Sequence, residues 1–597
     1  MVNLENMVKD RSDYRYFTET DMSRITLQDA YKKETRDQDK VIAPEETVRL
    51  FMDKLKHLNL NILEKTRRID NGRLDIPVYF SVCGPDALAL TGTKKQMGKG
   101  AGPHQAEASA VMELAERFSF FSFYTNSRNF FTDQYKNLKD RAISFRQIAE
   151  SVHDRSEDAE AARKIFEALP LRWAQGYNLT QDREVLIPFD WFYTINEFNG
   201  ACAGNCQEEA LAQGICEVVE RHVSSVISKE RLKVPLIDPD SATDPAVREM
   251  LGKYRNAGIE LWLSDFSLDT GIPTVGVLAF DPATFPDASE IVWTAGTAAN
   301  PQKALSRALS ETAQLGGDFN TGSNYVASGL PKFSRMEDAE FVTNPGKQVL
   351  ISDLPDLSND NIKVEILNLL SALSRKDREV IAVNTAHPML EIPAFYIIVP
   401  GAHFRERAAG SSVGMFCARL TAERNIPSVA INMLHHMEKL LPRKYYVRFF
   451  LGTSHLAVGD PDSAMSYLEE SLNLDPNPQD IPGIYSYMGV CLKEMGEYAR
   501  ALEVLTKGEE LDPDRTDIHN LKGFCYFKLK EHEKAIDSFQ KVLRLNPSSA
   551  IDHANIGVNY REMGEREKAI AWFETALAID PSIEFARESL KKLRAGK

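Results

Sequence analysis

The sequence has no long apolar run and few cysteines, and both shortages limit what the protein can be. No stretch approaches the about 20 consecutive apolar residues of a membrane-spanning helix. The N-terminal MVNLENMVKDRSDYRYF also has no apolar core of the kind found in secretory signals. The 7 cysteines are an odd number and lie mostly within apolar patterns, as reduced thiols do. The sequence therefore predicts a cytoplasmic protein with no membrane association.

Positive charge is also in short supply. The 71 Lys and Arg residues are outnumbered by 86 Asp and Glu residues, which gives a formal net charge of −15. Nucleic acid is therefore not expected as the primary ligand. No G-x-x-x-x-G-K-[ST] motif is present, which excludes a P-loop nucleotide site. A chain of 597 residues is too long for one hydrophobic core, so several domains are expected.

Three of the cysteines, Cys202, Cys206 and Cys216, lie in one region of the sequence. Their spacings match no common zinc or iron–sulfur pattern. We therefore interpret them as small buried residues, and a reactive thiol at Cys202 or Cys206 is the alternative.

The C-terminal part of the sequence repeats itself at steps of 37, 34 and 34 residues. A period of 34 with a small residue in each helix and a helix-ending proline is typical of tetratricopeptide repeats, which pair two antiparallel helices per unit. Four repeats are predicted from about Tyr445 to Pro581, followed by a polar capping helix. The recurring residues are Gly452, Gly489, Gly523 and Gly557, then Ala464, Ala501, Ala535 and Ala569, then Pro476, Pro513, Pro547 and Pro581.

The preceding part of the chain alternates strand-like and helical patterns. Its strand-like segments are rich in β-branched and aromatic residues and are bounded by Gly or Pro. We therefore predict a mixed α/β (α+β) domain over residues 1–424 and an all-α solenoid over residues 425–597. The predicted strand segments are 75–82, 184–194, 274–281, 290–297 and 394–401.

The motif E-x-x-E-R occurs twice inside strongly apolar helical patterns, at Glu113–Arg117 and at Glu217–Arg221. Residues at i, i+4 and i+7 share one face of a helix, so each motif extends into a polar stripe. Each stripe also follows a predicted strand and a glycine-containing loop. The three stripes are Ser109, Glu113, Glu116 and Arg117; Glu209, Gln213, Glu217, Glu220 and Arg221; and Arg307, Glu311 and Gln314.

Carboxylates inside apolar helices cost several kcal/mol each unless they are paired or bind a cation. Carboxylates, arginines and the Gly-Lys-Gly sequence around Lys99 are the groups that an ATP site with a divalent metal would use. The alternative is a solvated helix face with an intrahelical ion pair, which is the usual place for such residues. Recurrence of the motif in matching loop contexts favours the ATP site.

These motifs together resemble those of the YcaO family. They are S-x-x-x-E-x-x-E-R at Ser109–Arg117, G-N-x-x-x-E-A-x-x-Q-G-x-x-E-x-x-E-R at Gly204–Arg221 and R-x-x-x-E-x-x-Q at Arg307–Gln314. The likeness runs from MGKGA, which begins at Met97, to IIVPG, which ends at Gly401. It implies an enzyme that uses ATP to phosphorylate a backbone amide oxygen of a peptide or protein, in concert with attack of a nucleophile on the amide carbon.

The resemblance also implies ATP and Mg²⁺ as cofactors and assigns residues to them. Lys40 is included because it lies seven residues before Thr47, as in the N-terminal nucleotide contact of the family. The implied Mg²⁺ ligands are Glu113, Glu116, Glu209, Glu217 and Glu220. The implied ATP-binding residues are Lys40, Lys99, Ser109, Arg117, Asn205, Gln213, Arg221, Arg307 and Gln314, and the implied catalytic residues are Arg221, Arg307 and Glu311.

Two features depart from the family pattern. Members that form azolines commonly end in a proline-rich tail that enters the active site, whereas this sequence ends in LKKLRAGK, which disfavours azoline formation. Cys202 stands where a serine is expected beside the nucleotide.

Among the remaining activities of the family, we favour thioamide formation with an external sulfide over amidine formation. The first alternative is an accessory role in β-methylthiolation of a small-subunit ribosomal protein, because the bacterial member with that role also has a helical-repeat tail. The second is a non-catalytic nucleotide-binding adaptor that acts through its repeats. The expected partners are a peptide or protein substrate, with ribosomal proteins among the candidates, a sulfur donor or accessory protein, and a second copy in a homodimer.

Overall fold

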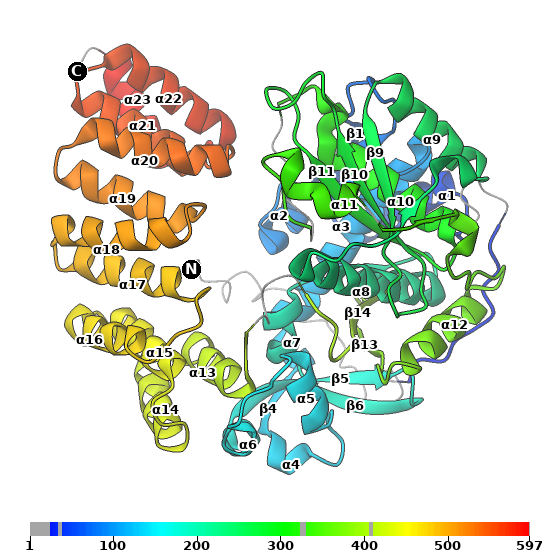
Figure 1. Cartoon of the computed structure of the whole chain (residues 1–597), viewed down its shortest axis with the longest axis horizontal. Helices are drawn as coiled ribbons and strands as arrows, with labels where there is room; N and C mark the ends of the chain where they lie inside the picture. Colours follow the sequence, from blue (N-terminus) through cyan, green and yellow to red (C-terminus); the bar gives the residue numbers. More distant parts are fainter. Residues whose placement is uncertain (1–23, 34–38, 323–329, 345, 405–409, 596–597) are drawn as a thin grey trace.

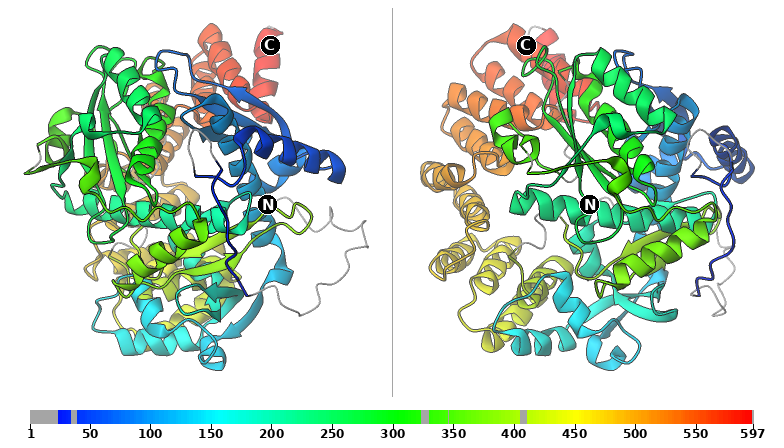
Figure 2. Two further views of the ribbon diagram at one scale, coloured as in Figure 1. Left: turned by 90° about the vertical axis from the view of Figure 1, so that its right-hand side faces the viewer. Right: turned by 45° about the vertical axis from the view of Figure 1, so that its right-hand side comes forward.

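The computed structural model describes residues 24–33, 39–322, 330–344, 346–404 and 410–595. The chain forms two parts that lie side by side (Figure 1). One is a mixed α/β part with three sheets, and the other is a curved column of helices at the C-terminal end. In the left view of Figure 2, the red C-terminal helices lie beside blue elements of the N-terminal part.

The α/β part contains twelve α-helices within the described residues. They are α1 (Pro44–Leu58), α2 (Pro85–Thr91), α3 (Pro103–Thr125), α4 (Tyr135–Leu138), α5 (Phe145–Ser151), α6 (Ala159–Ala168), α7 (Phe189–Asn196), α8 (Gln207–Glu230), α9 (Pro245–Asn256), α10 (Pro301–Gly316), α11 (Glu340–Thr343) and α12 (Ile362–Ser374). Short 3₁₀ turns are η2 (Ser127–Asn129), η3 (Pro239–Ser241), η4 (Gly317–Phe319), η5 (Met336–Ala339) and η6 (Ile351–Asp353).

The strands form three sheets, and all pairs are antiparallel except that of β8 with β12. The first sheet has the order β1-β2-β3, the second β11-β10-β9-β8-β12, and the third β4-β5-β13-β14-β7 with β6 also paired to β5. The strands are β1 (Leu63–Arg68), β2 (Val78–Cys83), β3 (Lys95–Lys99), β4 (Phe131–Gln134), β5 (Pro170–Asn178), β6 (Arg183–Pro188), β7 (Ala201–Ala203), β8 (Leu236–Ile237), β9 (Glu260–Asp265), β10 (Thr274–Phe280), β11 (Val292–Thr297), β12 (Gln348–Val349), β13 (Ile381–Asn384) and β14 (Ala394–Ile398).

The three helices that carry the polar stripes lie between the sheets. α3 contacts strands of the first and third sheets, α8 contacts strands of the third and second, and α10 contacts the second sheet and β3 of the first. Each helix directly follows an edge strand, namely β3, β7 or β11. The strand–loop–helix unit predicted from the sequence is therefore present three times, and it directs the three helices to a common centre.

Glycine allows each of these helices to approach its strand closely. A Cβ at Gly98 of β3 would lie 2.0 Å from the backbone nitrogen of Ala110 in α3. A Cβ at Gly296 of β11 would lie 2.4 Å from the carbonyl oxygen of Ala304 in α10, and one at Gly214 of α8 would lie 2.6 Å from the sulfur of Cys202 in β7. Any side chain at these positions would push the stripe-bearing helices away from the sheets.

The C-terminal part consists of helix pairs that stack into a solenoid. α13 (Val413–Arg424) and α14 (Pro427–Leu440) lead into four pairs and a capping helix, as the sequence predicts. Among successive first helices of the pairs, α15 contacts α17 and α17 contacts α19. The pairs are α15 (Tyr445–Ala457) with α16 (Pro461–Leu472), α17 (Ile481–Glu494) with α18 (Tyr498–Leu511), α19 (Thr516–Lys528) with α20 (His532–Leu545) and α21 (Ala550–Glu562) with α22 (Arg566–Ile579), and the cap is α23 (Glu584–Arg594).

The hydrophobic core of the α/β part continues into the first solenoid helices. Phe416 of α13, Leu434 of α14 and Leu451 of α15 belong to the same buried cluster as Trp191 and Tyr396. The domain boundary predicted after residue 424 falls in the short connection between α13 and α14. That the chain divides into separately folding domains at this boundary stays a prediction. The shared core shows that the solenoid is anchored at its base.

The predicted fold class is confirmed. Each of the five predicted strand segments overlaps a strand, but in one of them the predicted strand continues into a helix. In 184–194, β6 ends at Pro188 and the helix α7 begins at Phe189. The apolar run continues through both elements, and an apolar run alone cannot distinguish a buried strand from a buried helix. The change occurs at Pro188, which ends β6 and occupies the N-cap of α7 with an extended backbone.

The prediction of no secretory signal in residues 1–17 lies outside the described residues. Within the described part of the chain, no helix is long and apolar enough to cross a membrane.

Gly98→Ala should lower the free energy of unfolding by about 1–3 kcal/mol or more, because its Cβ would meet helix backbone rather than a movable side chain. Urea denaturation measures the change. The control is Gly252→Ala in α9, where a Cβ meets no atom within 4 Å and a gain of about 0.5–1 kcal/mol is expected. Equal stability of the two variants would contradict the close packing of α3 on β3.

Candidate active site

The charged stripes of α3, α8 and α10 meet in the space between the three sheets. Lys99, at the end of β3, interacts electrostatically with Glu113 of α3, Glu220 of α8 and Arg307 of α10. Lys99 also forms an ion pair with Glu311 of α10. Residues from four separate stretches of the sequence therefore converge, as the repeated motifs predict.

Each E-x-x-E-R motif forms ion pairs within its own helix. Arg117 lies 3.2 Å from Glu116 and 3.6 Å from Glu113, and Arg221 lies 3.4 Å from Glu220 and 3.7 Å from Glu217. The side chains are 16–20% exposed, except for Glu113 at 35%. The intrahelical ion pairs of the alternative interpretation are thus present, but most of the surface of these side chains is shielded from solvent, unlike that of a solvated helix face.

Burial shifts the protonation of these groups. It raises the pKa of Glu113, Glu116 and Glu220 above the usual glutamate range, although the neighbouring arginines act against this shift. Burial also lowers the pKa of Lys99 to about 8, with Glu220 acting against it. Ionised carboxylates at this position are therefore under-compensated, which is the condition under which an added cation binds favourably.

The donor chemistry fits a divalent cation. The carboxylates are not already arranged around a metal position: in the described ranges no three His, Cys, Asp or Glu side chains form such a group. The carboxylates of both motifs instead lie against the arginines of their own helices. Mg²⁺ prefers carboxylate oxygens shared with phosphate and water, and those oxygens are supplied here. Arg221 Nε is buried and has no hydrogen-bond partner within the described part of the chain, which leaves a donor for an anionic ligand.

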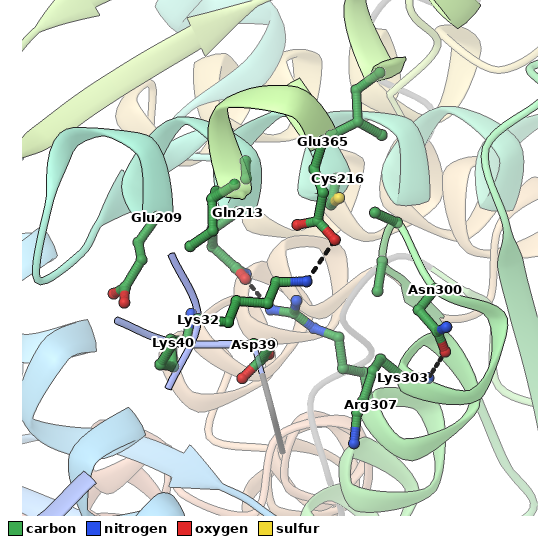
Figure 3. A pocket seen from close by; sticks show the side chains of 15 residues that line it. Lys32, Asp39, Lys40, Glu209, Gln213, Cys216, Asn300, Lys303, Arg307 and Glu365 are labelled. Carbon is green, nitrogen blue, oxygen red and sulfur yellow. Dashed lines mark hydrogen bonds and ion pairs between the residues drawn. The ribbon is translucent and has the colours of Figure 1, made fainter. Parts of the chain in front are cut away.

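A cleft opens beside the carboxylates (Figure 3). Its walls come from the N-terminal segment, from α8, α10 and α12, and from the loop before α10. Arg307 and Gln213 project into it, and the Arg307 guanidinium donates a hydrogen bond to the amide oxygen of Gln213. The lining residues are Lys32, Asp39, Lys40, Glu209, Ala212, Gln213, Cys216, Ala298, Ala299, Asn300, Lys303, Arg307, Ile362, Glu365 and Leu369.

Glu209 fixes one wall of this cleft. One of its carboxylate oxygens accepts a hydrogen bond from the backbone nitrogen of Val41 (2.6 Å), directly after Lys40. The other accepts from the backbone nitrogen (3.0 Å) and the side-chain amide (2.9 Å) of Asn205. Asn205 in turn accepts a hydrogen bond from the hydroxyl of Thr47 (3.0 Å). The pair Lys40 and Thr47, taken from the family pattern, therefore lies next to Asn205 and Glu209.

Two of the predicted site residues stand apart from these contacts. The Gln314 amide donates to the sulfur of Met97 (3.9 Å) and so faces β3. Ser109 lies one turn before Glu113 on α3 and, in the described ranges, is not part of the cleft wall. The roles assigned to both residues stay predictions.

Sequence reasoning missed several charged residues of the cleft, among them Lys32, Asp39 and Glu365. Lys32 and Glu365 form an ion pair across it. One carboxylate oxygen of Asp39 is buried without a hydrogen-bond partner in the described chain, so it can accept a hydrogen bond from a ligand. The N-terminal segment and α12 are far apart in sequence and show no shared motif, so no signal in the sequence predicts that they meet.

The cysteines of this region are inert in the structure. Cys202 is buried, and its thiol donates to the carbonyl oxygen of Phe395 (3.4 Å). Burial raises the pKa of Cys202, raises that of Cys206 to about 11 and raises that of Cys216 to about 12. Thiols with such pKa values are poor nucleophiles at neutral pH, which supports the interpretation as small packed residues.

Family models match both parts of the chain. Residues 97–403 match the model described as the YcaO cyclodehydratase, which binds ATP and Mg²⁺. Tetratricopeptide-repeat models match residues 455–525, 516–549 and 550–583. The predicted cofactors, ATP and Mg²⁺, and the predicted repeats are thereby confirmed.

Several proteins of known sequence are similar to the chain. An uncharacterised protein of Methanothermobacter thermautotrophicus is 26% identical over 388 residues, which are 60% of this chain and 94% of that protein. The ribosomal protein S12 methylthiotransferase accessory factor YcaO of Escherichia coli is 28% identical over 240 residues, which are 37% of this chain and 39% of that protein. The chain thus matches well under half of the E. coli protein.

Among solved structures, a heterocyclase in complex with substrate and cofactor has a TM-score of 0.53 at 20% identity, over 64% of this chain and 55% of the heterocyclase. This similarity shows that the two proteins share the fold of the α/β part.

Glu116→Gln should raise the free energy of unfolding near neutral pH. The pKa of Glu116 is raised in the folded state, so ionisation destabilises the protein above that pKa, and the effect disappears below the pKa of about 4.3 of a free glutamate. Urea denaturation of the wild-type protein and of Glu116→Gln, at neutral pH and at a pH below about 4.3, measures the difference in the free energy of unfolding. The exposed Glu503→Gln in α18 should change nothing. A less stable Glu116→Gln variant at neutral pH would show that the buried carboxylates stabilise the fold.

Proposed function

The chain belongs to the YcaO family, and on that basis we propose that it uses ATP to O-phosphorylate a backbone amide of a peptide or protein substrate for sulfur insertion. The observation that carries this proposal is the convergence of buried carboxylates and guanidinium groups of α3, α8 and α10 beside an open cleft. Such a set of charges costs folding free energy, and phosphates with Mg²⁺ would compensate it.

In this proposal the carboxylates and the basic groups have separate tasks. Glu113, Glu116, Glu217 and Glu220 would hold Mg²⁺, which neutralises phosphate charge when bound. Glu209 would support them from the cleft wall, where it already holds the loop of Asn205.

The basic groups would bind the phosphates. Arg221, Arg307 and Lys99 would stabilise the charge that develops during phosphoryl transfer, as guanidinium and ammonium groups do in other phosphoryl-transfer sites. Arg117 would keep the carboxylates of α3 in place, because it contacts both of them.

The proposed reaction balances with ATP and hydrosulfide as co-substrates. The sulfur atom attacks the amide carbon, and the amide oxygen takes the γ-phosphoryl group of ATP, releasing ADP. The C–O bond then breaks, phosphate leaves with that oxygen, the proton on sulfur is released and ends on the phosphate, and a C=S bond remains. The protein contributes position and charge, which account for most of the rate enhancement in phosphoryl transfer.

The similarity to the E. coli S12 methylthiotransferase accessory factor favours a second candidate function, an accessory role in modifying a ribosomal protein. The third candidate, an adaptor that binds nucleotide without using it, differs from both in its ATP turnover. Sulfur insertion rests on the resemblance of two segments, TRDQDKVIAPEET at residues 35–47 and RLDIPVYFSV at residues 73–82, to thioamide-forming members of the family. It is the part of the proposal that needs a chemical test.

The solenoid would recognise the protein substrate. Its base is fixed by the core shared among α13, α14 and α15, and at its far end Lys94, before β3, donates to the carbonyl oxygen of Ile579 (3.4 Å). The curved column is therefore held along one side of the α/β part (Figure 1). Stacked helix pairs offer an extended surface for a peptide or a partner helix.

The proposed function predicts a product that contains sulfur in place of oxygen. Mass spectrometry of proteins from cells with and without the gene should find a protein that is heavier by the difference between sulfur and oxygen only when the gene is present. Glu220→Gln removes a ligand charge but keeps side-chain size, so it should abolish both this product and ATP turnover by the purified protein.

The control for that variant is Glu470→Gln in α16, whose carboxylate pairs with Arg448 on the solenoid surface. It should turn over ATP at the wild-type rate. Wild-type turnover by Glu220→Gln with an unchanged circular dichroism spectrum would contradict the carboxylate assignment. ATP turnover without any mass change would favour the accessory role over sulfur insertion.

Removing the solenoid beyond its anchored base should separate recognition from nucleotide binding. A cut at the predicted domain boundary, after about Arg424, would remove Leu434 and Leu451 from the shared core. A chain ending at Asn473 keeps α13 to α16. It should bind ATP with unchanged affinity by calorimetry and lose at least about tenfold in substrate modification, equivalent to about 1.4 kcal/mol of binding. Full modification by the shortened chain would contradict the recognition role, and loss of ATP binding would make the solenoid structural.

A further inference from the structure

Six basic side chains gather at a place that the cleft does not include. They come from the loop after α5, from α8, from the loop before β13 and from the loop after β14. His222 is buried, His153, Arg378 and His403 are half-buried, and Arg155 and Lys229 are exposed. None of the six is among the residues that line the nucleotide cleft. The cluster is therefore positively charged, partly buried and accessible from solvent, and the proposed function gives it no role.

The rings at its centre are in direct contact. The imidazoles of His153 and His403 stack with centroids 3.7 Å apart and an angle of 5° between their planes. The ring of His222 lies 5.4 Å from that of His403, and the backbone nitrogen of His403 donates to His222 Nδ1 (3.0 Å). The arrangement is fixed by the backbone and not by loosely placed side chains.

The charges around the rings are of one sign. Burial, followed by His403, Lys229 and Arg155, lowers the pKa of His153 to about 4. Burial, followed by Lys229, Arg378 and Arg155, lowers the pKa of His403 to about 4. At neutral pH both rings are therefore uncharged, and the positive charge of the cluster comes from Arg378, Arg155 and Lys229. Their combined field favours an anion at this place.

The neighbouring carboxylates are engaged elsewhere. Asp154 accepts hydrogen bonds from the backbone nitrogens of Ser156 and Val413. Asp269, the acidic group that acts on Arg378, pairs with Lys376 at 3.2 Å.

The next two carboxylates along the chain are also occupied. Glu150 of α5 pairs with Arg146 at 3.2 Å. Glu379 accepts hydrogen bonds from Gln147, Asn178 and Gln181. These hydrogen bonds and ion pairs all join the four carboxylates to groups other than the basic side chains of the cluster.

Two buried nitrogen atoms in the cluster have no hydrogen-bond partner within the described part of the chain. They are Nη1 of Arg378 and Nε2 of His153. An unpaired buried polar group costs about 1–3 kcal/mol, so each of these atoms is expected to contact a water molecule or an ion. A metal ion does not fit, because the surrounding cations would repel it and the histidines are not arranged as a metal site in the described ranges.

We propose that His153, His403, Arg378, Arg155 and Lys229 form an oxyanion-binding site, separate from the nucleotide cleft. Arg378 supplies a planar fork of donors, and the exposed ends of Arg155 and Lys229 attract the anion. The ligand is a small oxyanion, either free phosphate or the carboxylate of an acidic side chain on a protein. The proposal does not depend on the proposed function, because it uses no residue of the active site.

The test is a titration of the full-length protein with inorganic phosphate at constant ionic strength, observed through histidine ring signals by NMR. Signals of His153 and His403, assigned with the variants His153→Gln and His403→Gln, should shift and saturate. Arg378→Gln should weaken the apparent affinity at least about tenfold, since hydrogen bonds to charged groups contribute about 1.5–3 kcal/mol. The exposed Arg375→Gln, three residues earlier, is the matched control and should keep the wild-type affinity.

Arg307→Gln separates this site from the cleft, where phosphate could also bind, and it should leave the histidine shifts intact. A second titration with a glutamate-rich peptide distinguishes the two sources: saturation by phosphate alone identifies a phosphate site, and saturation by the peptide identifies a carboxylate site. The proposal is wrong if neither ligand saturates, or if Arg378→Gln binds phosphate as tightly as Arg375→Gln.

Discussion

The burial of ion pairs on three neighbouring helices is the constraint on which the rest of the structure depends. Carboxylates and guanidinium groups are rarely buried in an apolar interior, because the interior does not replace their hydration. Here Arg117 and Arg221 each hold two carboxylates of their own helix, and the raised pKa values of Glu113, Glu116 and Glu220 show that this pairing is incomplete. The fold therefore maintains a concentration of charge whose full compensation requires a ligand.

The three sheets make this arrangement possible. Each stripe-bearing helix follows an edge strand and packs between two sheets, and glycine at the closest contact brings helix and strand backbones together. α8 is shared most widely. Gln213 on α8 lines the cleft, Glu217 and Glu220 on α8 belong to the carboxylates, and His222 on α8 belongs to the basic cluster. Different faces of one helix thus present different chemistry, and its position is fixed by Gly214 against β7.

Much of this could be predicted from the sequence, because helical periodicity decides which residues share a face. The stripes containing Glu113 and Glu220 and the repeats beginning near Tyr445 followed from spacing alone. The approach of Lys32 to Glu365 did not, because it depends on an irregular N-terminal segment that Asn361 holds through the backbone nitrogen of Ala30. Such long-range contacts have no local signature. The change from β6 to α7 at Phe189 was also missed, because an apolar run suits either element.

The central claim is that the converging charges form one site for ATP together with Mg²⁺. Calorimetric titration of the full-length protein with ATP, once with Mg²⁺ and once with a chelator, tests it most directly. The account predicts one ATP per chain with Mg²⁺ and an affinity at least about tenfold lower without it, a loss of about 1.4 kcal/mol or more. ATP binding of equal affinity under both conditions would contradict the assignment of the buried carboxylates to the metal, and no ATP binding under either condition would contradict the site itself.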